Sequence, residues 1–247
     1  MGRWRNAKGT SRRDWVLLSV LVGSGCAPIS PPPLFARHHG AGADPEGAVV
    51  VTLAAGIGGA DLGGGFGLEL RASWQATEAL AVGVGLGGAS GGDPKRHGDD
   101  EDEEGLAPAA RLYALRLFGR ATPPSADWVA ATFGAGASLT DGGLFALTVD
   151  GGGVVSGIIA DTVEPSLGLA AALSLPLSQG KGLLTDGDVQ LPSTTLYLGG
   201  SVGLGVHLGD TRNVISTELG AWRAFAQGGV GATVYALSLA DGQGFTP

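Results

Sequence analysis

Large apolar residues alternate with small or polar residues along most of this chain. In residues 62–75, LGGGFGLELRASWQ, the even positions hold every Leu, Phe and Trp, and the odd positions hold only Gly, Glu, Arg, Ser or Gln. Successive side chains of a β-strand point to opposite faces, so this period of two predicts a strand with two different faces. The same period recurs along the chain and predicts ten strands, at 48–58, 62–75, 79–88, 109–119, 128–139, 143–150, 166–177, 195–208, 214–225 and 229–240.

One segment fits this series poorly. The apolar run at 154–160 is long enough to add an extra strand after 143–150. An added strand would make the number of strands odd. The predicted strand number is therefore ten, within a range of about 8 to 12.

The small-residue face separates two architectures. In a soluble β-sandwich the large residues form the core, and the opposite face meets water and is rich in Lys, Glu, Thr and Gln. Here the opposite face is mostly Gly, Ala and Ser with few charges. Such a face suits the inside of a narrow closed barrel whose large residues point outward to lipid. We therefore expect an all-β fold, an antiparallel up-and-down transmembrane β-barrel, with a lipid-anchored β-sandwich as the alternative.

The predicted connections differ in length on the two sides of the sheet. The odd-numbered connections include the two longest, 89–108 and 178–194, whereas the even-numbered connections 75–78 and 209–213 are short. Long loops on one side and short turns on the other are typical of outer-membrane barrels. With this pattern, residues 48–240 resemble the small bacterial outer-membrane β-barrel proteins. The resemblance implies extracellular long loops, contact with outer-membrane lipid and insertion by the barrel assembly machinery, although the chain lacks the usual terminal aromatic residue.

The N-terminal region carries an export signal. Five basic residues within 1–13 precede a short apolar run at 15–22, which is too short to cross a bilayer as a helix of about 20 residues. Residues 11–16, SRRDWV, resemble a twin-arginine motif, and VGSGC at 22–26 resembles a lipoprotein signal. The resemblance implies acylation of Cys26 and handling by the lipoprotein sorting machinery. We expect a signal peptide at 1–25, a flexible tether rich in Pro and Gly at 26–47, and the barrel domain at 48–247.

Composition and charge exclude several classes to which this protein could belong. Gly accounts for 46 of 247 residues without a triplet period, and 44% hydrophobic with 15% charged residues is the reverse of a disordered composition. Without residues 1–25 the chain keeps ten Lys and Arg against 22 Asp and Glu, a net charge of −12. A chain this acidic is a poor nucleic-acid binder. Cys26 is the single cysteine, so no intramolecular disulfide is possible.

Two groups of charged residues are candidate sites. A basic side chain turned to lipid at mid-membrane costs about 2 to 4 kcal/mol and an acidic one less, so charges within the strands should point inward. We expect these to form an ion-pair network that fills the lumen rather than an ion path: Glu69, Arg71, Arg116 and Glu218. A run of acids in the first long loop offers ligands for a surface cation, although a solvated charge run is the simpler interpretation. The run comprises Asp99, Asp100, Glu101, Asp102, Glu103 and Glu104.

The expected function is therefore structural. We predict a non-enzymatic outer-membrane barrel, lipid-anchored at Cys26, that displays acidic loops and encloses at most a narrow pore. No cofactor, resident metal or nucleic-acid partner is expected, and the sequence identifies no ligand. A lipid-modifying hydrolase is a second alternative, for which His207 is the only histidine within a predicted strand.

Overall fold

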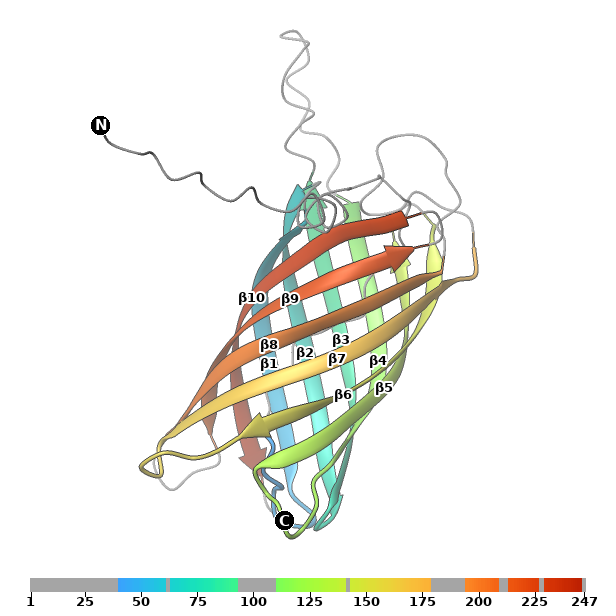
Figure 1. Cartoon of the computed structure of the whole chain (residues 1–247). Coiled ribbons are helices and arrows are strands. Elements are labelled where there is room, and N and C mark those ends of the chain that lie inside the picture. The colour runs from blue at the N-terminus through green and yellow to red at the C-terminus, as the bar shows by residue number, and fades with distance from the viewer. Residues whose placement is uncertain are drawn as a thin grey trace, which may run out of the picture.

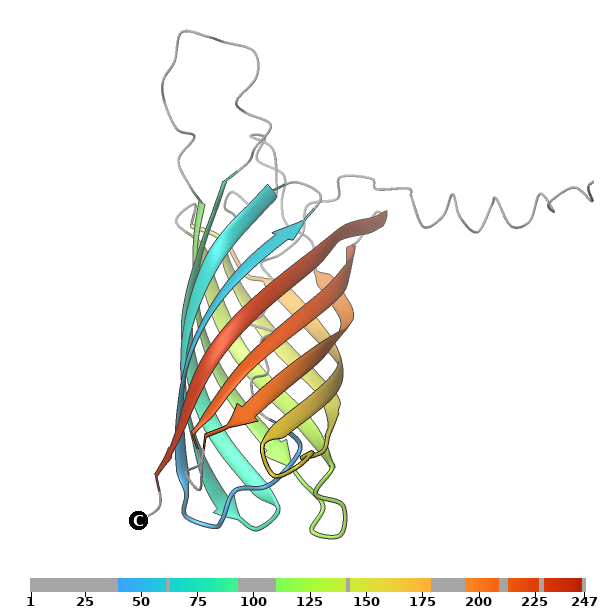
Figure 2. The same ribbon diagram turned by 90° about the vertical axis from the view of Figure 1, so that its left-hand side faces the viewer.

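The strands follow one another as neighbours around a ring. The computed structural model describes residues 40–60, 63–92, 110–140, 143–178, 194–208, 213–226 and 229–245. Its strands are β1 (Val49–Ala60), β2 (Gly63–Thr77), β3 (Leu80–Gly92), β4 (Ala110–Ala121), β5 (Val129–Thr140), β6 (Phe145–Ser156), β7 (Val163–Pro176), β8 (Thr195–His207), β9 (Val214–Ala226) and β10 (Gly229–Phe245). Every sequential pair is antiparallel, and β1 also pairs with β10, which closes the barrel (Figures 1 and 2). The predicted ten-stranded antiparallel barrel is confirmed, and the β-sandwich alternative is wrong.

The extra strand that residues 154–160 suggested does not form. β6 continues through Val154 and Val155, which pair with β5 on one side and with β7 on the other. The chain then turns between Ile159 and Val163, which form an isolated bridge. Because the first part of the apolar run belongs to β6, the number of strands in the described chain stays even.

Outward and inward positions differ in size, as the alternation predicted. Leu53 of β1, Leu70 of β2, Leu86 of β3 and Leu115 of β4 are cross-strand partners in one continuous row, and 48 to 58% of each side chain is exposed. Large exposed apolar residues occur on the outer face of every strand. The described part of the chain contains no helix long and apolar enough to span a membrane.

The inner face is lined by small and polar side chains. On β1 the inward residues Val50, Thr52 and Ala54 are at most 8% exposed. Larger inward side chains gather on β2, β4 and β6, and a second group lies on β8 and β9, where Tyr197 and Trp222 are buried. The lumen is therefore filled unevenly around the ring.

The end of the barrel at which β1 begins and β10 finishes is named here the lower mouth, after its place in Figure 1. The connections at this end are residues 78–79, 122–128, 157–162 and 208–213. The two long connections, between β3 and β4 and between β7 and β8, belong to the opposite end. The barrel thus keeps short turns and long loops apart, as outer-membrane barrels do.

Candidate functional site: the lumen

Strand register places the large inward side chains of β4 beside glycines on both neighbouring strands, β3 and β5. One inward row across β2 to β6 reads Arg71, Gly85, Arg116, Gly136 and Thr148. The next inward row reads Ser73, Gly83, Phe118, Gly134 and Asp150. Large side chains of β4 therefore lie over the glycines of β3 and β5.

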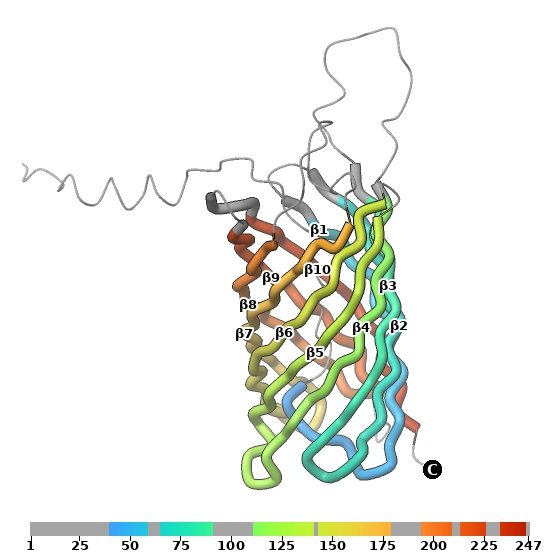
Figure 3. The backbone as a smooth tube through the Cα atoms, turned by 90° about the vertical axis from the view of Figure 1, so that its right-hand side faces the viewer, coloured from blue at the N-terminus to red at the C-terminus, as the bar shows by residue number. Residues whose placement is uncertain are grey.

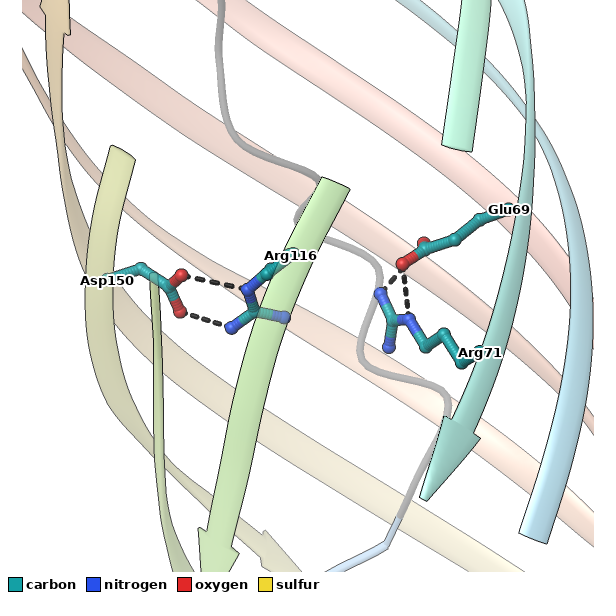
Figure 4. Close-up of polar contacts among 4 residues, drawn as sticks. All are labelled: Glu69, Arg71, Arg116 and Asp150. Atoms are coloured by element: carbon teal, nitrogen blue, oxygen red, sulfur yellow. Dashed lines mark hydrogen bonds and ion pairs between the residues drawn. The ribbon is translucent and has the colours of Figure 1, made fainter. Parts of the chain in front are cut away.

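Two buried ion pairs occupy this wall of the lumen (Figure 4). Arg71 donates from Nε to Glu69 Oε1 at 2.5 Å and from Nη2 to Glu69 Oε2 at 2.8 Å. Arg116 donates from Nε to Asp150 Oδ2 at 2.9 Å and from Nη2 to Asp150 Oδ1. No side chain of the two pairs is more than 8% exposed. Each guanidinium thus meets its carboxylate in the two-point geometry that favours Arg over Lys.

Phe118 connects the two pairs. Its ring centroid lies 5.8 Å from Arg71 Cζ and 5.7 Å from Arg116 Cζ, within the range of a cation–π contact. Ion pairs and ring together form a continuous unit across β2, β4 and β6. We name this unit the lumen belt, consisting of Glu69, Arg71, Phe118, Arg116 and Asp150.

Glycines on β3 and β5 make room for the belt. A Cβ on Gly83 would lie 2.5 Å from Phe118 Cζ, which is far closer than side-chain atoms approach. A Cβ on Gly134 would lie 2.6 Å from Arg116 Nε and 2.8 Å from Asp150 Oδ2. These glycines therefore have a packing role, as glycines within strands often do where another group approaches closely.

The lumen residues expected from the sequence are arranged in two places. Glu69, Arg71 and Arg116 belong to the belt, whereas Glu218 lies on β9 and lines a small cavity together with Glu164, Ser166 and Ser216. Asp150, the partner of Arg116, and Phe118 were not among the lumen residues predicted from the sequence. Alternation alone gives both residues inward parity, but only cross-strand register brings them to Arg116.

His207 takes part in a polar chain near the lower mouth. Its Nε2 lies 3.0 Å from Glu164 Oε2, and Ser156 Oγ donates to Glu164 Oε1 at 2.6 Å. The carboxylate thus lies between the serine and the histidine. A hydrolase needs the histidine next to the nucleophile, so this order does not activate Ser156.

The start of the described chain packs inside the lower mouth, as the blue segment in Figure 3 shows. Ala41 is fully buried against Ala130 and Val154. Its N–H donates to Ser156 Oγ at 2.6 Å, and its carbonyl accepts from Thr122 Oγ1 at 2.8 Å. Residues 40–47 belong to the segment predicted as a flexible tether, and within it barrel side chains satisfy both backbone polar groups of Ala41.

Arg120 of β4 binds the same segment. Its Nη1 donates to the Gly40 carbonyl at 3.1 Å, and its Nη2 lies 3.2 Å from Asp44 Oδ2. Gly40 also lies so close to Glu164 that a Cβ would collide with its carboxylate. The lower mouth therefore binds residues 40–44 through one ion pair, three hydrogen bonds and an apolar contact.

Two of the predicted sites lie outside the described residues: Cys26 and the acidic run 99–104. Within the described ranges, no group of three or more His, Cys, Asp or Glu is placed to hold a metal ion.

No protein-family model matches the chain, and no curated protein matches its sequence. Among solved structures it is similar to an outer membrane channel from Pseudomonas putida F1, with 11% identity and a TM-score of 0.48 over 85% of this chain and 100% of that one. It is also similar to the translocator domain of the autotransporter NalP from Neisseria meningitidis, with 14% identity and a TM-score of 0.43 over 94% of both chains. LpxR from Salmonella typhimurium matches with 11% identity and a TM-score of 0.37 over 78% of this chain and 99% of that one. Likeness at this level assigns neither a family nor an activity, and the barrel fold rests on the strand pairing described above.

Proposed function

We propose that this protein is an outer-membrane β-barrel without enzymatic activity, whose outer face contacts lipid and whose lumen is partly filled by paired side chains. The observation that carries the proposal is the closed ring of strands with large exposed apolar residues on its outer face. In water, so many exposed Leu, Val, Ile and aromatic side chains would cause aggregation. In a bilayer the same apolar side chains face hydrocarbon, which is favourable. A closed barrel also pairs the backbone groups of its strands, which a bilayer requires.

The filled lumen favours a barrel that anchors its loops in the membrane over a barrel that forms a wide pore. The lumen belt occupies the wall from β2 to β6, and residues 40–44 occupy the lower mouth. Both ion pairs are buried with their partners, which suits a structural filling. We propose that the barrel holds the acidic run 99–104 at the cell surface, because this run belongs to the connection opposite the lower mouth.

The proposed lipid anchor is compatible with this orientation. If the lower mouth faces the periplasm, Gly40 lies at the end of the barrel on the side where lipoproteins are acylated. The 14 residue-to-residue steps from Cys26 to Gly40 span up to about 45 to 50 Å when extended, which is enough to reach the inner leaflet of the outer membrane. We therefore propose Cys26 as an acylated residue in addition to the barrel.

The proposal is tested on the full-length protein expressed in a Gram-negative host. We expect it to remain in membranes washed with alkali and high salt, to require detergent for extraction, and to migrate differently on a gel before and after heating. Cys26→Ser should lose incorporation of radioactive fatty acid and keep the heat-dependent shift, because the barrel does not depend on the anchor.

A fusion of residues 1–47 to a soluble domain is the matched control. It should require detergent when acylated and show no heat-dependent shift. A full-length protein that behaves like this fusion, or one released by alkali, would contradict the proposed membrane barrel.

A further inference from the structure

Residues 40–47 cross the lower mouth, and the first five of them, residues 40–44, are named here the strap. At its start, Ala41 contacts the inward faces of β5 and β6. A few residues later, Gly47 N–H donates to the Gln75 carbonyl at 2.8 Å, at the edge where β1 joins β2. β6 lies five strands from β1 in a ring of ten, so the chain spans the full width of the mouth.

The contacts that hold the strap do not include a strand pair. Ala41 and Gly40 bond to the side chains of Ser156, Thr122 and Arg120, and pairing with the sheet begins only after the strap. The Arg120 and Asp44 side chains are 12% and 31% exposed, so water and salt weaken their attraction. The strap can therefore leave the mouth while all ten strands remain paired.

The space behind the strap consists of two small cavities. Gly40 lines the first, together with Glu164, Ser166, Ser216 and Glu218. Arg120 lines the second, together with Arg71, Arg116, Phe118 and Thr132 of the neighbouring wall. Both cavities thus border residues of the strap or the side chain that holds it.

The wall next to the first cavity carries small inward side chains. The inward residues of β10, from Val234 to Gly242, are Val, Ala, Ser or Gly. Three buried polar atoms of the inner face have no protein partner: Thr52 Oγ1, Gln75 Oε1 and Ser138 Oγ. Buried polar atoms of this kind are normally hydrated, so the inner face offers sites for water on β1, β2 and β5.

We propose that the strap is a releasable closure of the lumen, and that its release opens a narrow aqueous path for small ions through the barrel. This inference rests on the proposed membrane placement. It adds a conducting state to a barrel that is closed while Ala41 is seated. Ala41 is the residue that decides between the two states, since it is fully buried and has both backbone polar groups bonded to the barrel.

The test is conductance of the full-length protein in planar lipid bilayers in KCl. Ala41→Trp cannot be accommodated against Ala130 and Val154 and should expel the strap, so we expect open time to rise by at least about tenfold, equivalent to 1.4 kcal/mol. Ala43→Trp is the matched control, because it adds the same bulk at an exposed position of the strap. It should remain as silent as the wild type.

Arg120→Gln provides a second, milder release. It removes the ion pair to Asp44 and the bond to the Gly40 carbonyl without adding bulk, and should raise open time in the same direction. The heat-dependent gel shift establishes that each variant is folded, and if Ala41→Trp fails to fold, Arg120→Gln decides alone.

Folded variants that are as silent as the wild type would overturn the strap proposal and leave the membrane barrel intact. Equal conductance of Ala41→Trp and Ala43→Trp would also overturn it. Failure of the wild type itself to insert into bilayers would overturn the proposed membrane placement and the strap proposal together.

Discussion

Arg116 illustrates what a buried charge requires from its neighbours. The guanidinium needs a carboxylate on β6, an aromatic face on its own strand and a glycine on β5 that leaves room for both. These requirements are met by Asp150, Phe118 and Gly134. A buried ion pair contributes little net stability by itself, but the loss of one partner leaves an uncompensated charge.

We predict that Asp150→Asn destabilises the barrel by about 3 to 5 kcal/mol, the usual cost of removing one partner from a buried pair. The measurement is the free energy of unfolding in urea for the protein in lipid vesicles. The double variant Arg116→Gln with Asp150→Asn should recover part of the loss, because it leaves no unpaired charge in the lumen. A single variant as stable as the wild type would contradict the structural role of the belt.

Individual strands have two faces that meet different surroundings. β4 carries Tyr113, Leu115 and Leu117 outward, each 48 to 62% exposed, and Arg116 and Phe118 inward. Leu115 lies near the middle of its strand and pairs with Leu86 of β3 and Ala137 of β5. The row that includes Leu115 therefore marks the centre of the surface proposed to contact lipid.

We predict that Leu115→Arg lowers the free energy of unfolding in lipid vesicles by about 2 to 4 kcal/mol, the cost of a basic residue at the bilayer midplane. Leu139→Arg is the matched control, since Leu139 is 46% exposed and lies next to the end of β5. Near the interface the same change costs about 0 to 1 kcal/mol. Equal costs at the two positions would contradict the proposed depth of the Leu115 row.

The complete barrel depends on the ladder between its first and last strands. Twelve residues of β1 pair with β10, from Val49 with Phe245 to Ala60 with Val234. Without this ladder the sheet would have two open edges, and unpaired backbone groups in lipid cost several kcal/mol each. Closure is therefore a property of the whole molecule rather than of one hairpin.

We predict that a chain ending at Ala240 loses its heat-dependent gel shift, because Val49 to Leu53 then have no partners on β10. A chain ending at Phe245 keeps every pair of the ladder and should retain the shift. The measurement is gel mobility of heated and unheated samples extracted from membranes. Retention of the shift by the shorter chain would indicate that the lower part of the ladder is dispensable for closure.

Alternation along the chain determined the strands, their number and which face of each is apolar, because side-chain direction in a strand depends only on position parity. It also gave the inward direction of Glu69, Arg71, Arg116 and Glu218. The run at 154–160 left an extra strand open, since parity does not say where a strand stops.

The tertiary structure decided which inward residues meet. Asp150 reaches Arg116, and Glu164 reaches His207, only through the register of neighbouring strands, which the pattern of a single strand does not contain. The contacts of the strap depended on the assembled sheet as well, because its partners come from β4, β6 and the residue after β4. The period of two and the direction of each side chain are local properties of the chain. Contacts between side chains of different strands exist only after those strands have paired in register.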